Sequence, residues 1–433
     1  MAKKYLAIDL GASSGRGIVG YEEGGEIVLK EVYRFPNGMK QSEYGLLWDT
    51  DELFNHIKNA IKEAIKQFGE IESLAIDTWG VDYVLLKGDE DVKPHYAYRN
   101  DRVDKVIPQV HSIVPFSQLY EHTGIQFANF NTVYQLFDDK QKGRLEGVTD
   151  FLMIPEYFSY LLTGVKKKEY TDASTTGLLC AKCGEFDKEI TNKLGLPECL
   201  FPKLNHPGTY VGMLKPEIAE EVGGQMKVLL CASHDTGSAF EAVDCPDDAI
   251  IISSGTWSLI GTKLKEANTS ELSFNTNFTN EGGVGYIRYL KNIMGMWVVN
   301  NVQKPKGYSF KEVADLVATS KYERIFDVND SSLNAPENME LAIKELLKDN
   351  PPMNDADLFN SIFHSLAYSY KVAADGMEAN LGKKFNSIYI VGGGANNKYL
   401  NELTEKYTGK KVVALPIEAT AIGNIKIQMK ENR

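Results

Sequence analysis

The 433-residue chain has few cysteines and no long apolar run, and each shortage excludes a class of protein. No segment reaches the roughly 18 consecutive apolar residues that a membrane-spanning helix needs. The N-terminus also lacks the pattern of a secretory signal. Five scattered cysteines, an odd number, fit a reducing compartment better than a disulfide-stabilised secreted fold. We therefore expect a cytoplasmic protein with no membrane partner.

Basic residues are outnumbered. The chain has 47 Lys and Arg against 59 Asp and Glu, which gives a formal net charge of -12. An acidic chain is a poor match for nucleic acid or an anionic membrane surface, so we expect neither as a partner. A bound polyanion such as ATP would need local hydrogen-bond donors and Mg²⁺.

Zinc-site spacing is absent as well. Cys180 and Cys183 form a single C-x-x-C, and no second pair or His pair accompanies it. We interpret these two residues as small side chains at the edge of a packed hairpin.

What the chain does contain is one structural plan, present twice. In each half, apolar strands joined by Gly/Ser turns precede a long amphipathic helix, a glycine stop and another apolar strand. In the first half the strands are expected at 5–8, 17–21, 27–35 and 73–76, with the helix at 49–68. In the second half they are expected at 249–253, 257–264 and 387–391, with the helix at 355–381.

This duplication predicts an α/β protein. Its two actin-like or ribonuclease H-like ATPase domains, each a β-meander–helix–strand unit, would flank a catalytic cleft. We place the domains at residues 1–243 and 244–433, and we interpret residues 94–216 as an insertion that fits neither repeat. Two unrelated α/β domains with ordinary hairpins are the alternative.

A polar turn after the first strand has the composition of a phosphate-binding loop. Small residues let the backbone approach phosphate oxygens, and the turn adds hydroxyl and guanidinium donors: Ala12, Ser13, Ser14, Gly15 and Arg16. The lysine and spacing of a Walker A loop are missing. Asp9, at the end of the same apolar strand, is expected to bind Mg²⁺, directly or through water, because an isolated buried carboxylate is costly.

Two further turns occur in the second half. Ser254-Gly255-Thr256 resembles the first turn and is a candidate second phosphate contact. The glycine run Gly392–Gly394 suits a flat adenine ring lying against bare backbone. Each of these turns, taken alone, is equally consistent with an ordinary tight turn.

Asp235 is the candidate catalytic base. It lies in the polar segment Ser233–Gly237, where an apolar run opens into what we expect to be a glycine-hinged turn. Phosphoryl transfer to an alcohol needs a carboxylate near the hydroxyl that loses its proton. His234 and Thr236 flank this residue.

These segments together resemble the FGGY carbohydrate kinases, and within them the rhamnulokinase branch. The resemblance rests on AIDLGASSGR, IDTWGVD, AYRNDR, ASHDT, SSGTWSL, NEGG with KNIMGMW, and IVGGGANN, which cover nearly the whole chain in the branch's order. It implies transfer of the γ-phosphate of ATP to L-rhamnulose with Mg²⁺, in L-rhamnose catabolism. It also implies that residues 1–243 bind the sugar and residues 244–433 the nucleotide.

The resemblance assigns a role to individual residues. It makes Asp235 the proton acceptor and places five residues at the sugar: Gly80, His234, Asp235, Thr236 and Asn292. It places another set at ATP: Ala12, Ser13, Ser14, Gly15, Arg16, Thr256, Asn300 and Gly393. The branch can carry Gln where this chain has Asn300.

Other functions remain open from the sequence. They are a kinase for L-fuculose or another deoxyketose, a non-catalytic sugar sensor on the same fold, and an actin-like filament protein or chaperone ATPase. An intact Asp235 argues against the sensor, since a sensor needs no base. The polar insertion argues against the last class.

Overall fold

The computed structural model describes residues 2–334, 336–415 and 418–432. The chain forms two compact units. Unit 1 comprises residues 1–242, 264–289 and 419–433, and unit 2 comprises residues 243–263 and 290–418. The chain first passes from unit 1 to unit 2 between residues 242 and 243, next to the domain boundary at 243/244 that the sequence suggests. Two later segments, 264–289 and 419–433, return to unit 1, the second because helix α16 (Ala419–Glu431) is buried against its sheet.

Unit 1 is built on a six-stranded sheet in the order β10-β11-β6-β1-β2-β3. In chain order its strands are β1 (Lys4–Leu10), β2 (Ser14–Glu23), β3 (Glu26–Pro36), β6 (Ser73–Thr78), β10 (Tyr210–Met213) and β11 (Lys227–Leu229). β1 pairs antiparallel with β2 and parallel with β6, and β6 in turn pairs parallel with β11. The expected meander and its following strand are therefore confirmed.

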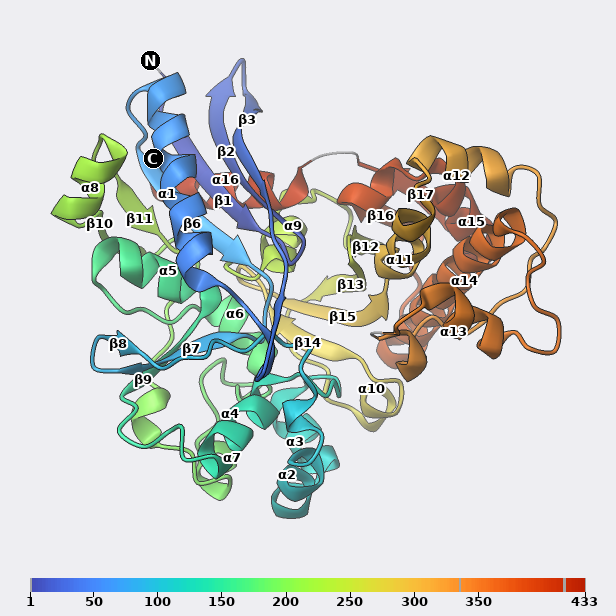
Figure 1. The fold of residues 1–433 in the computed structure, drawn as a ribbon, viewed down its shortest axis with the longest axis horizontal. Coiled ribbons are helices and arrows are strands. Elements are labelled where there is room, and N and C mark those ends of the chain that lie inside the picture. Colours follow the sequence, from blue (N-terminus) through green and yellow to red (C-terminus); the bar gives the residue numbers. More distant parts are fainter. Residues whose placement is uncertain (1, 335, 416–417, 433) are drawn as a thin grey trace. The chain divides into compact units, whose positions relative to one another are not determined.

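Helices cover both faces of this sheet (Figure 1). Alternate residues of β1 point to opposite faces, as strand geometry requires. Leu6 and Ile8 belong to the cluster formed with α1 (Thr50–Phe68), whereas Tyr5 and Ala7 belong to the cluster formed with α16. α1 confirms the helix expected at 49–68. Its N-cap, Asp49, accepts a hydrogen bond from the backbone of Glu52, one half of a capping box.

The insertion contributes most of a second hydrophobic cluster in unit 1. A small sheet in the order β8-β7-β9 joins β9 (Asp150–Met153) of the insertion to two strands that precede it, β7 (Tyr83–Lys87) and β8 (Glu90–Asp91). The α-helices between residues 94 and 222 are α2 (Ile107–Ile113), α3 (Phe116–Thr123), α4 (Thr132–Gln141), α5 (Ile154–Thr163), α6 (Tyr170–Ala173), α7 (Lys188–Lys193) and α8 (Pro216–Val222).

Unit 2 repeats the plan of unit 1. Its sheet contains, in order, β15 (Ile287–Met294), β13 (Trp257–Leu264), β12 (Ala249–Ser254), β16 (Ser387–Val391) and β17 (Lys411–Ala414). β12 is antiparallel to β13 and parallel to β16, just as β1 is to β2 and β6. The expected long helix is α14 (Asp355–Leu381). These matching pairings confirm the duplicated α/β architecture.

The remaining strands and α-helices complete the two units. They are β4 (Lys40–Ser42), β5 (Gly45–Leu47), β14 (Thr279–Gly282), α9 (Asp235–Ala242), α10 (Glu271–Asn275), α11 (Met296–Lys306), α12 (Phe310–Val317), α13 (Met339–Leu346) and α15 (Lys398–Thr408).

The C-x-x-C segment holds a bond that the sequence interpretation missed. Cys180 and Cys183 lie on a hairpin, as expected, but they form a disulfide. The tight turn brings their Cα atoms to 5.3 Å, within the range that a disulfide can bridge. The inference from cysteine count alone did not anticipate this pairing.

Packing of α16 on α9 depends on a glycine. A Cβ on Gly423 would lie 1.8 Å from the backbone oxygen of Ser238 in α9. Because a backbone atom cannot give way as a flexible side chain can, the two helices would have to separate. Gly423 therefore helps to fix α9, the helix that begins at Asp235.

We expect Gly423→Ala to lower the free energy of unfolding by about 1–3 kcal/mol through this overlap. Urea denaturation measures the change. Gly38→Ala is the matched control, because Gly38 is exposed and a Cβ there meets no atom within 4 Å. Equal stability of the two variants would contradict the packing argument.

Candidate active site

Acidic side chains gather at the carboxyl ends of adjacent parallel strands in unit 1. Asp9 on β1 lies in register with Asp77 on β6. Thr78 then pairs with His234 in a parallel bridge, and its N–H donates to the Ser233 carbonyl at 2.9 Å. The carboxyl edge of parallel strands is a common place for ligand sites. The topology thus brings the expected metal-binding and base residues to one edge.

Asp235 opens α9 directly after this bridge. The sequence interpretation of a glycine-hinged turn was wrong, because Gly237 lies inside the helix. A Cβ on Gly237 would come within 3.2 Å of the Ala232 Cβ, so this glycine allows close packing and is not a hinge. The helix holds the carboxylate more rigidly than a turn would.

The Asp235 carboxylate is held in place but remains reachable. Its Oδ1 accepts hydrogen bonds from the backbone N–H of Thr236 at 2.5 Å and from the Thr236 hydroxyl at 3.1 Å. The Nε2 atom of His234 lies 3.5 Å from the same oxygen, and the Asp235 side chain is 32% exposed. A fixed and partly exposed carboxylate meets the geometric requirements of a general base.

Asp77 is a functional candidate that the sequence analysis missed. It is fully buried, and Asn424 of α16 donates a hydrogen bond to its Oδ2 at 2.5 Å. Burial and then the nearby Asp9 charge raise the pKa of Asp77 well above its ordinary value. Its Oδ1 has no hydrogen-bond partner among the described residues. The signal was available, since Asp77 ends an apolar strand just as Asp9 does.

These two carboxyl groups fit a divalent cation that retains several waters. Asp9 is paired with Arg16, and Asp77 supplies a buried oxygen in register beside it. The part of the chain that the structure describes contains no cluster of three or more His, Cys, Asp or Glu suited to a metal. Mg²⁺ needs no such cluster, because it is usually held by one or two carboxylates together with water and phosphate oxygens.

The polar turn between β1 and β2 lies beside Asp9. Its backbone is tied down by the N–H of Gly11 donating to the Ser14 carbonyl at 2.9 Å, and the Ser13 side chain is exposed. A Cβ on Gly15 would overlap the Phe35 ring, so this glycine is required by packing. Arg16 follows on β2, opposite Asp9. Ala12 and Ser14 are half-buried, and the turn can offer donors to an anion.

Gly80 occupies a tight turn after β6. A Cβ there would lie 2.9 Å from the Thr175 side chain, and the next residue, Val81, has a φ of 68°. The N–H of Val81 donates to the Thr175 hydroxyl at 3.1 Å. The turn is therefore anchored to the insertion and presents backbone at position 80.

Buried Asp82 stabilises the same turn. It accepts hydrogen bonds from the indole N–H groups of Trp48 at 2.6 Å and Trp79 at 3.0 Å, from the Tyr98 backbone, and from Gln135. Burial raises its pKa to about 6 despite these donors. The group is thus a structural acid whose charge depends on pH.

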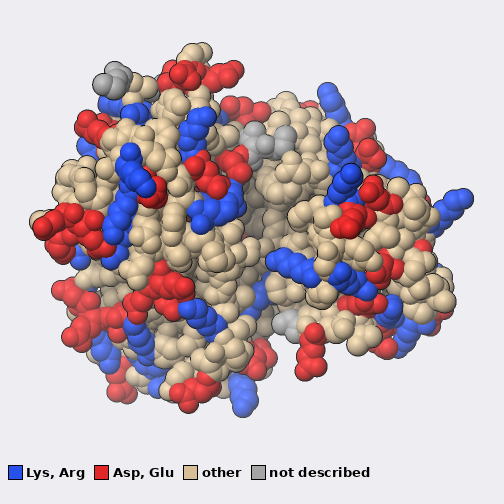
Figure 2. All heavy atoms as spheres, turned by 45° about the horizontal axis from the view of Figure 1, so that its top comes forward, with Lys and Arg blue, Asp and Glu red and all other residues tan. Residues whose placement is uncertain are grey.

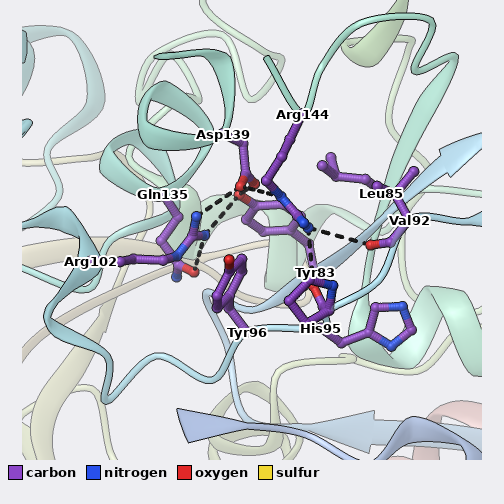
Figure 3. Close-up of a pocket in the computed structure, with 10 residues that line it drawn as sticks. Tyr83, Leu85, Val92, His95, Tyr96, Arg102, Gln135, Asp139 and Arg144 are labelled. Carbon is purple, nitrogen blue, oxygen red and sulfur yellow. Dashed lines mark hydrogen bonds and ion pairs between the residues drawn. The ribbon is translucent and has the colours of Figure 1, made fainter. Parts of the chain in front are cut away.

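Arg102, in a polar segment of the insertion, takes part in a buried ion-pair network. The Arg102 guanidinium is 5% exposed and pairs with Asp138 and Asp139 at 2.8 Å. It lies over the Tyr96 ring, as does Arg144, which shares Asp139 (Figure 3). Asp138 also pairs with Lys142 at 3.0 Å, so both carboxylates hold cationic side chains within the insertion.

Residues 169–172, another polar segment of the insertion, contact the residues just before Asp235. Glu169 caps α6 and also accepts the Ser233 N–H at 3.2 Å. The Thr171 hydroxyl accepts the His234 N–H at 3.4 Å. Asp172 is fully buried, and neither of its carboxyl oxygens has a hydrogen-bond partner among the described residues. Burial and neighbouring carboxylates raise the pKa of Asp172 well above its ordinary value.

Unit 2 brings two of the expected nucleotide residues together. The Thr256 carbonyl accepts backbone N–H groups of Gly295 and Trp297 at the start of α11, the helix that carries Asn300. Asn292 precedes this helix on β15.

The glycine run packs on the same turn of unit 2. Gly392 has a φ of 82°, and a Cβ on Gly394 would overlap the Ser254 hydroxyl. Gly393, between them, is exposed and faces open space. The outer glycines are thus required by the fold, and the central one is free to contact a ligand.

Comparison with known proteins identifies the family. Residues 4–240 match the N-terminal domain of the FGGY family of carbohydrate kinases, and residues 250–431 match its C-terminal domain. The chain belongs to the FGGY family of carbohydrate kinases. The expected fold and enzyme class are therefore confirmed.

Curated relatives refine the placement within the FGGY family. A protein of Oceanobacillus iheyensis named rhamnulokinase is 41% identical over 98% of this chain and 92% of the relative. A Bacillus subtilis rhamnulokinase is 39% identical over 98% of the chain and 90% of the relative.

Solved structures share the FGGY fold at low identity. A ligand-bound xylulose kinase from Lactobacillus acidophilus has a TM-score of 0.82 at 17% identity, and the match covers 99% of this chain and 89% of that one. A Plasmodium falciparum glycerol kinase with ADP has a TM-score of 0.79 at 15% identity, covering 100% and 90%.

The charged side chains on the surface and the hydropathy of the helices are both consistent with the amino-acid composition. Lys and Arg alternate with Asp and Glu over the displayed face, with no extended basic patch there (Figure 2). No helix within the described ranges has the length and apolar character to cross a membrane.

The Asp82 carboxyl generates a pH-dependent stability prediction. An aspartate in the unfolded chain has a pKa of about 3.9, whereas the pKa of Asp82 in the folded protein is about 6. The fold favours the protonated form, so this stabilisation is present below about pH 4 and is lost as pH rises through about 6. We therefore expect the free energy of unfolding of the wild type, relative to that of Asp82→Asn, to fall by about 2–3 kcal/mol as pH rises through that window.

Urea denaturation at several pH values measures this difference. Asp104→Asn is the control, because Asp104 is an exposed carboxylate. A difference between wild type and Asp82→Asn that does not vary with pH would show that Asp82 does not titrate in this window.

Proposed function

We propose that the chain is an ATP-dependent rhamnulokinase that converts L-rhamnulose to L-rhamnulose 1-phosphate in L-rhamnose catabolism, with Asp235 as its base. One observation carries the proposal: Asp235 is a fixed, partly exposed carboxylate at the carboxyl edge of the unit 1 sheet in a chain about 40% identical to rhamnulokinases. A sugar sensor would need no such base.

Asp235 acts on the sugar hydroxyl at carbon 1. As that oxygen bonds to the γ-phosphorus, the bond from phosphorus to the β–γ bridging oxygen breaks and ADP leaves. The hydroxyl proton passes to the Asp235 carboxylate. Oδ1 already accepts two hydrogen bonds from Thr236 and lies near Nε2 of His234, so Oδ2 is the oxygen that receives the proton.

Sugar contacts come from residues whose places are set by the fold. Gly80 presents backbone from a turn anchored to Thr175, and His234 and Thr236 flank the base. Asn292 is the further amide proposed to pair with a sugar hydroxyl. Such paired amides reject analogues that leave them without a partner.

Nucleotide contacts follow the same logic. Residues 12–16 supply donors for phosphate oxygens, and Thr256 and Asn300 add polar groups in unit 2. Gly393 lies against the adenine because no side chain intervenes. Asp9, with Asp77 beside it, would hold Mg²⁺ directly or through water, and the bound ion would neutralise phosphate charge.

Replacing Asp235 with Asn should lower kcat by roughly 10²–10⁴-fold, because the amide cannot accept the proton. A coupled assay of ADP release with L-rhamnulose measures kcat, and isothermal calorimetry checks that the sugar still binds. Glu220→Gln, an exposed change on α8, is the control. Turnover within about threefold of wild type would exclude Asp235 as the base.

The sugar itself is tested in the same assay with a panel of ketoses. We expect L-rhamnulose to give the highest kcat/KM. A preference for L-fuculose or another deoxyketose would keep the kinase assignment and replace the substrate.

Gly393→Val should raise the KM for ATP about tenfold, equivalent to about 1.4 kcal/mol of lost contact, and leave that for sugar unchanged. The new side chain points into open space, so folding should be intact. Gly393→Ala, with a smaller side chain, should give a smaller rise. An unchanged KM for ATP in a folded Val variant would place the adenine elsewhere.

A further inference from the structure

A fully buried arginine lies behind the proposed sugar-binding histidine. Arg288 on β15 is 0% exposed, and its Nε donates to the Gly282 carbonyl at 2.7 Å. Its Nη1 and Nη2 each lie 3.2 Å from Nδ1 of His234. Nη1 is also 3.1 Å from Oε2 of Glu281. All four residues belong to unit 1.

The arginine restricts where the histidine can carry its proton. A guanidinium has donors and no acceptor, and it does not lose its charge in proteins. If Nδ1 of His234 carried hydrogen, it would face two Arg288 N–H groups donor to donor. With a lone pair on Nδ1 both contacts become hydrogen bonds, and the ring proton must then be on Nε2.

Glu281 is the competing partner. Its Oε2 lies 3.3 Å from Nδ1 and would accept a proton from it. The same oxygen is closer to Arg288 Nη1, at 3.1 Å, and the guanidinium offers Nδ1 two donor nitrogens where the carboxylate offers one acceptor. The balance favours the arginine, with Glu281 neutralising its buried charge.

We propose that Arg288 is a positioning residue that holds His234 in its Nε2–H tautomer and so directs a hydrogen-bond donor to the sugar beside Asp235. The inference rests on the proposed function for the sugar's identity. The tautomer follows from the contacts of Arg288 alone.

The consequence lies on the other side of the ring. Nε2 is 3.5 Å from Oδ1 of Asp235. As a donor, it stabilises the carboxylate and can bond a sugar hydroxyl oxygen. As an acceptor, it would set a lone pair against the carboxylate and leave that hydroxyl oxygen without its donor. Partners behind a functional histidine fix its ring nitrogens in this way in metal sites, where removing them costs about 10–100-fold.

Histidine-labelled protein tests the tautomer directly. Long-range proton–nitrogen NMR correlations distinguish Nε2–H from Nδ1–H, and His234→Gln identifies the His234 signals by their loss. We expect the Nε2–H tautomer in the wild type and in Arg288→Lys, because a lysine ammonium also donates hydrogen bonds and accepts none. Arg288→Gln should permit Nδ1–H, because an amide oxygen accepts. Nδ1–H in wild type would overturn the proposal without any variant.

Arg102→Gln is the matched control for the NMR experiment. Arg102 is another buried arginine of unit 1, paired with Asp138 and Asp139 and not with His234. Its removal should leave the His234 tautomer unchanged. A tautomer change in this variant equal to that in Arg288→Gln would mean that general loosening, and not Arg288, controls the ring.

Kinetics then separate positioning from a merely structural role. We expect Arg288→Gln to lower kcat/KM for the sugar about 10–100-fold, with partial recovery in Arg288→Lys. In a His234→Gln background, where no tautomer exists, the same change should cost no more than about twofold. Equal losses in both backgrounds would overturn the proposal. Absence of kinase activity on every ketose would instead refute the proposed function, and the NMR result would stand.

Discussion

The candidate site depends on the parallel pairing of β1 with β6 and its continuation at residues 233 and 234. Because parallel strands end at the same edge, this pairing brings Asp9, Asp77 and Asp235 together from segments far apart in sequence. A slip of one residue in this pairing would turn the carboxyl groups to the opposite face of the sheet. The register is therefore the constraint from which the rest of the site follows.

A buried polar ladder from α16 reinforces that register. Gln428 donates to the Leu6 carbonyl on β1 at 3.0 Å and accepts from Ser73 on β6 at 2.7 Å. Gln428 also donates to Asn424 at 2.7 Å, and Asn424 in turn holds Asp77. Hydrogen bonds between buried polar groups are geometrically demanding, so this helix can dock on the two strands in only one way. The last helix of the chain thus stabilises residues near its beginning.

Three acidic residues on the protein side of the candidate base are buried, and burying their carboxyl groups costs stability. Burial raises the pKa of Glu156 to about 8, and burial also raises the pKa values of Glu169 and Asp172. Glu169 is compensated by backbone and hydroxyl donors, whereas Asp172 keeps its orphaned oxygens. Unsatisfied buried groups concentrate at functional sites, where they pre-organise the polar environment of the reacting groups. Their position behind Asp235 and His234 fits that pattern.

Local patterns in the sequence were sufficient for much of this structure. Apolar periodicity predicted α1, α14 and the duplicated strands, and the composition of the polar and glycine-rich segments pointed to Asp235 and to the glycine run. These signals are local, because side-chain period and turn chemistry depend on near neighbours. These local signals did not reveal three features: the return of residues 264–289 to unit 1, the helix at Asp235, and the pairing of Arg288 with His234, 54 positions away. Each depends on which surfaces meet when distant segments pack, and only the tertiary structure decides that.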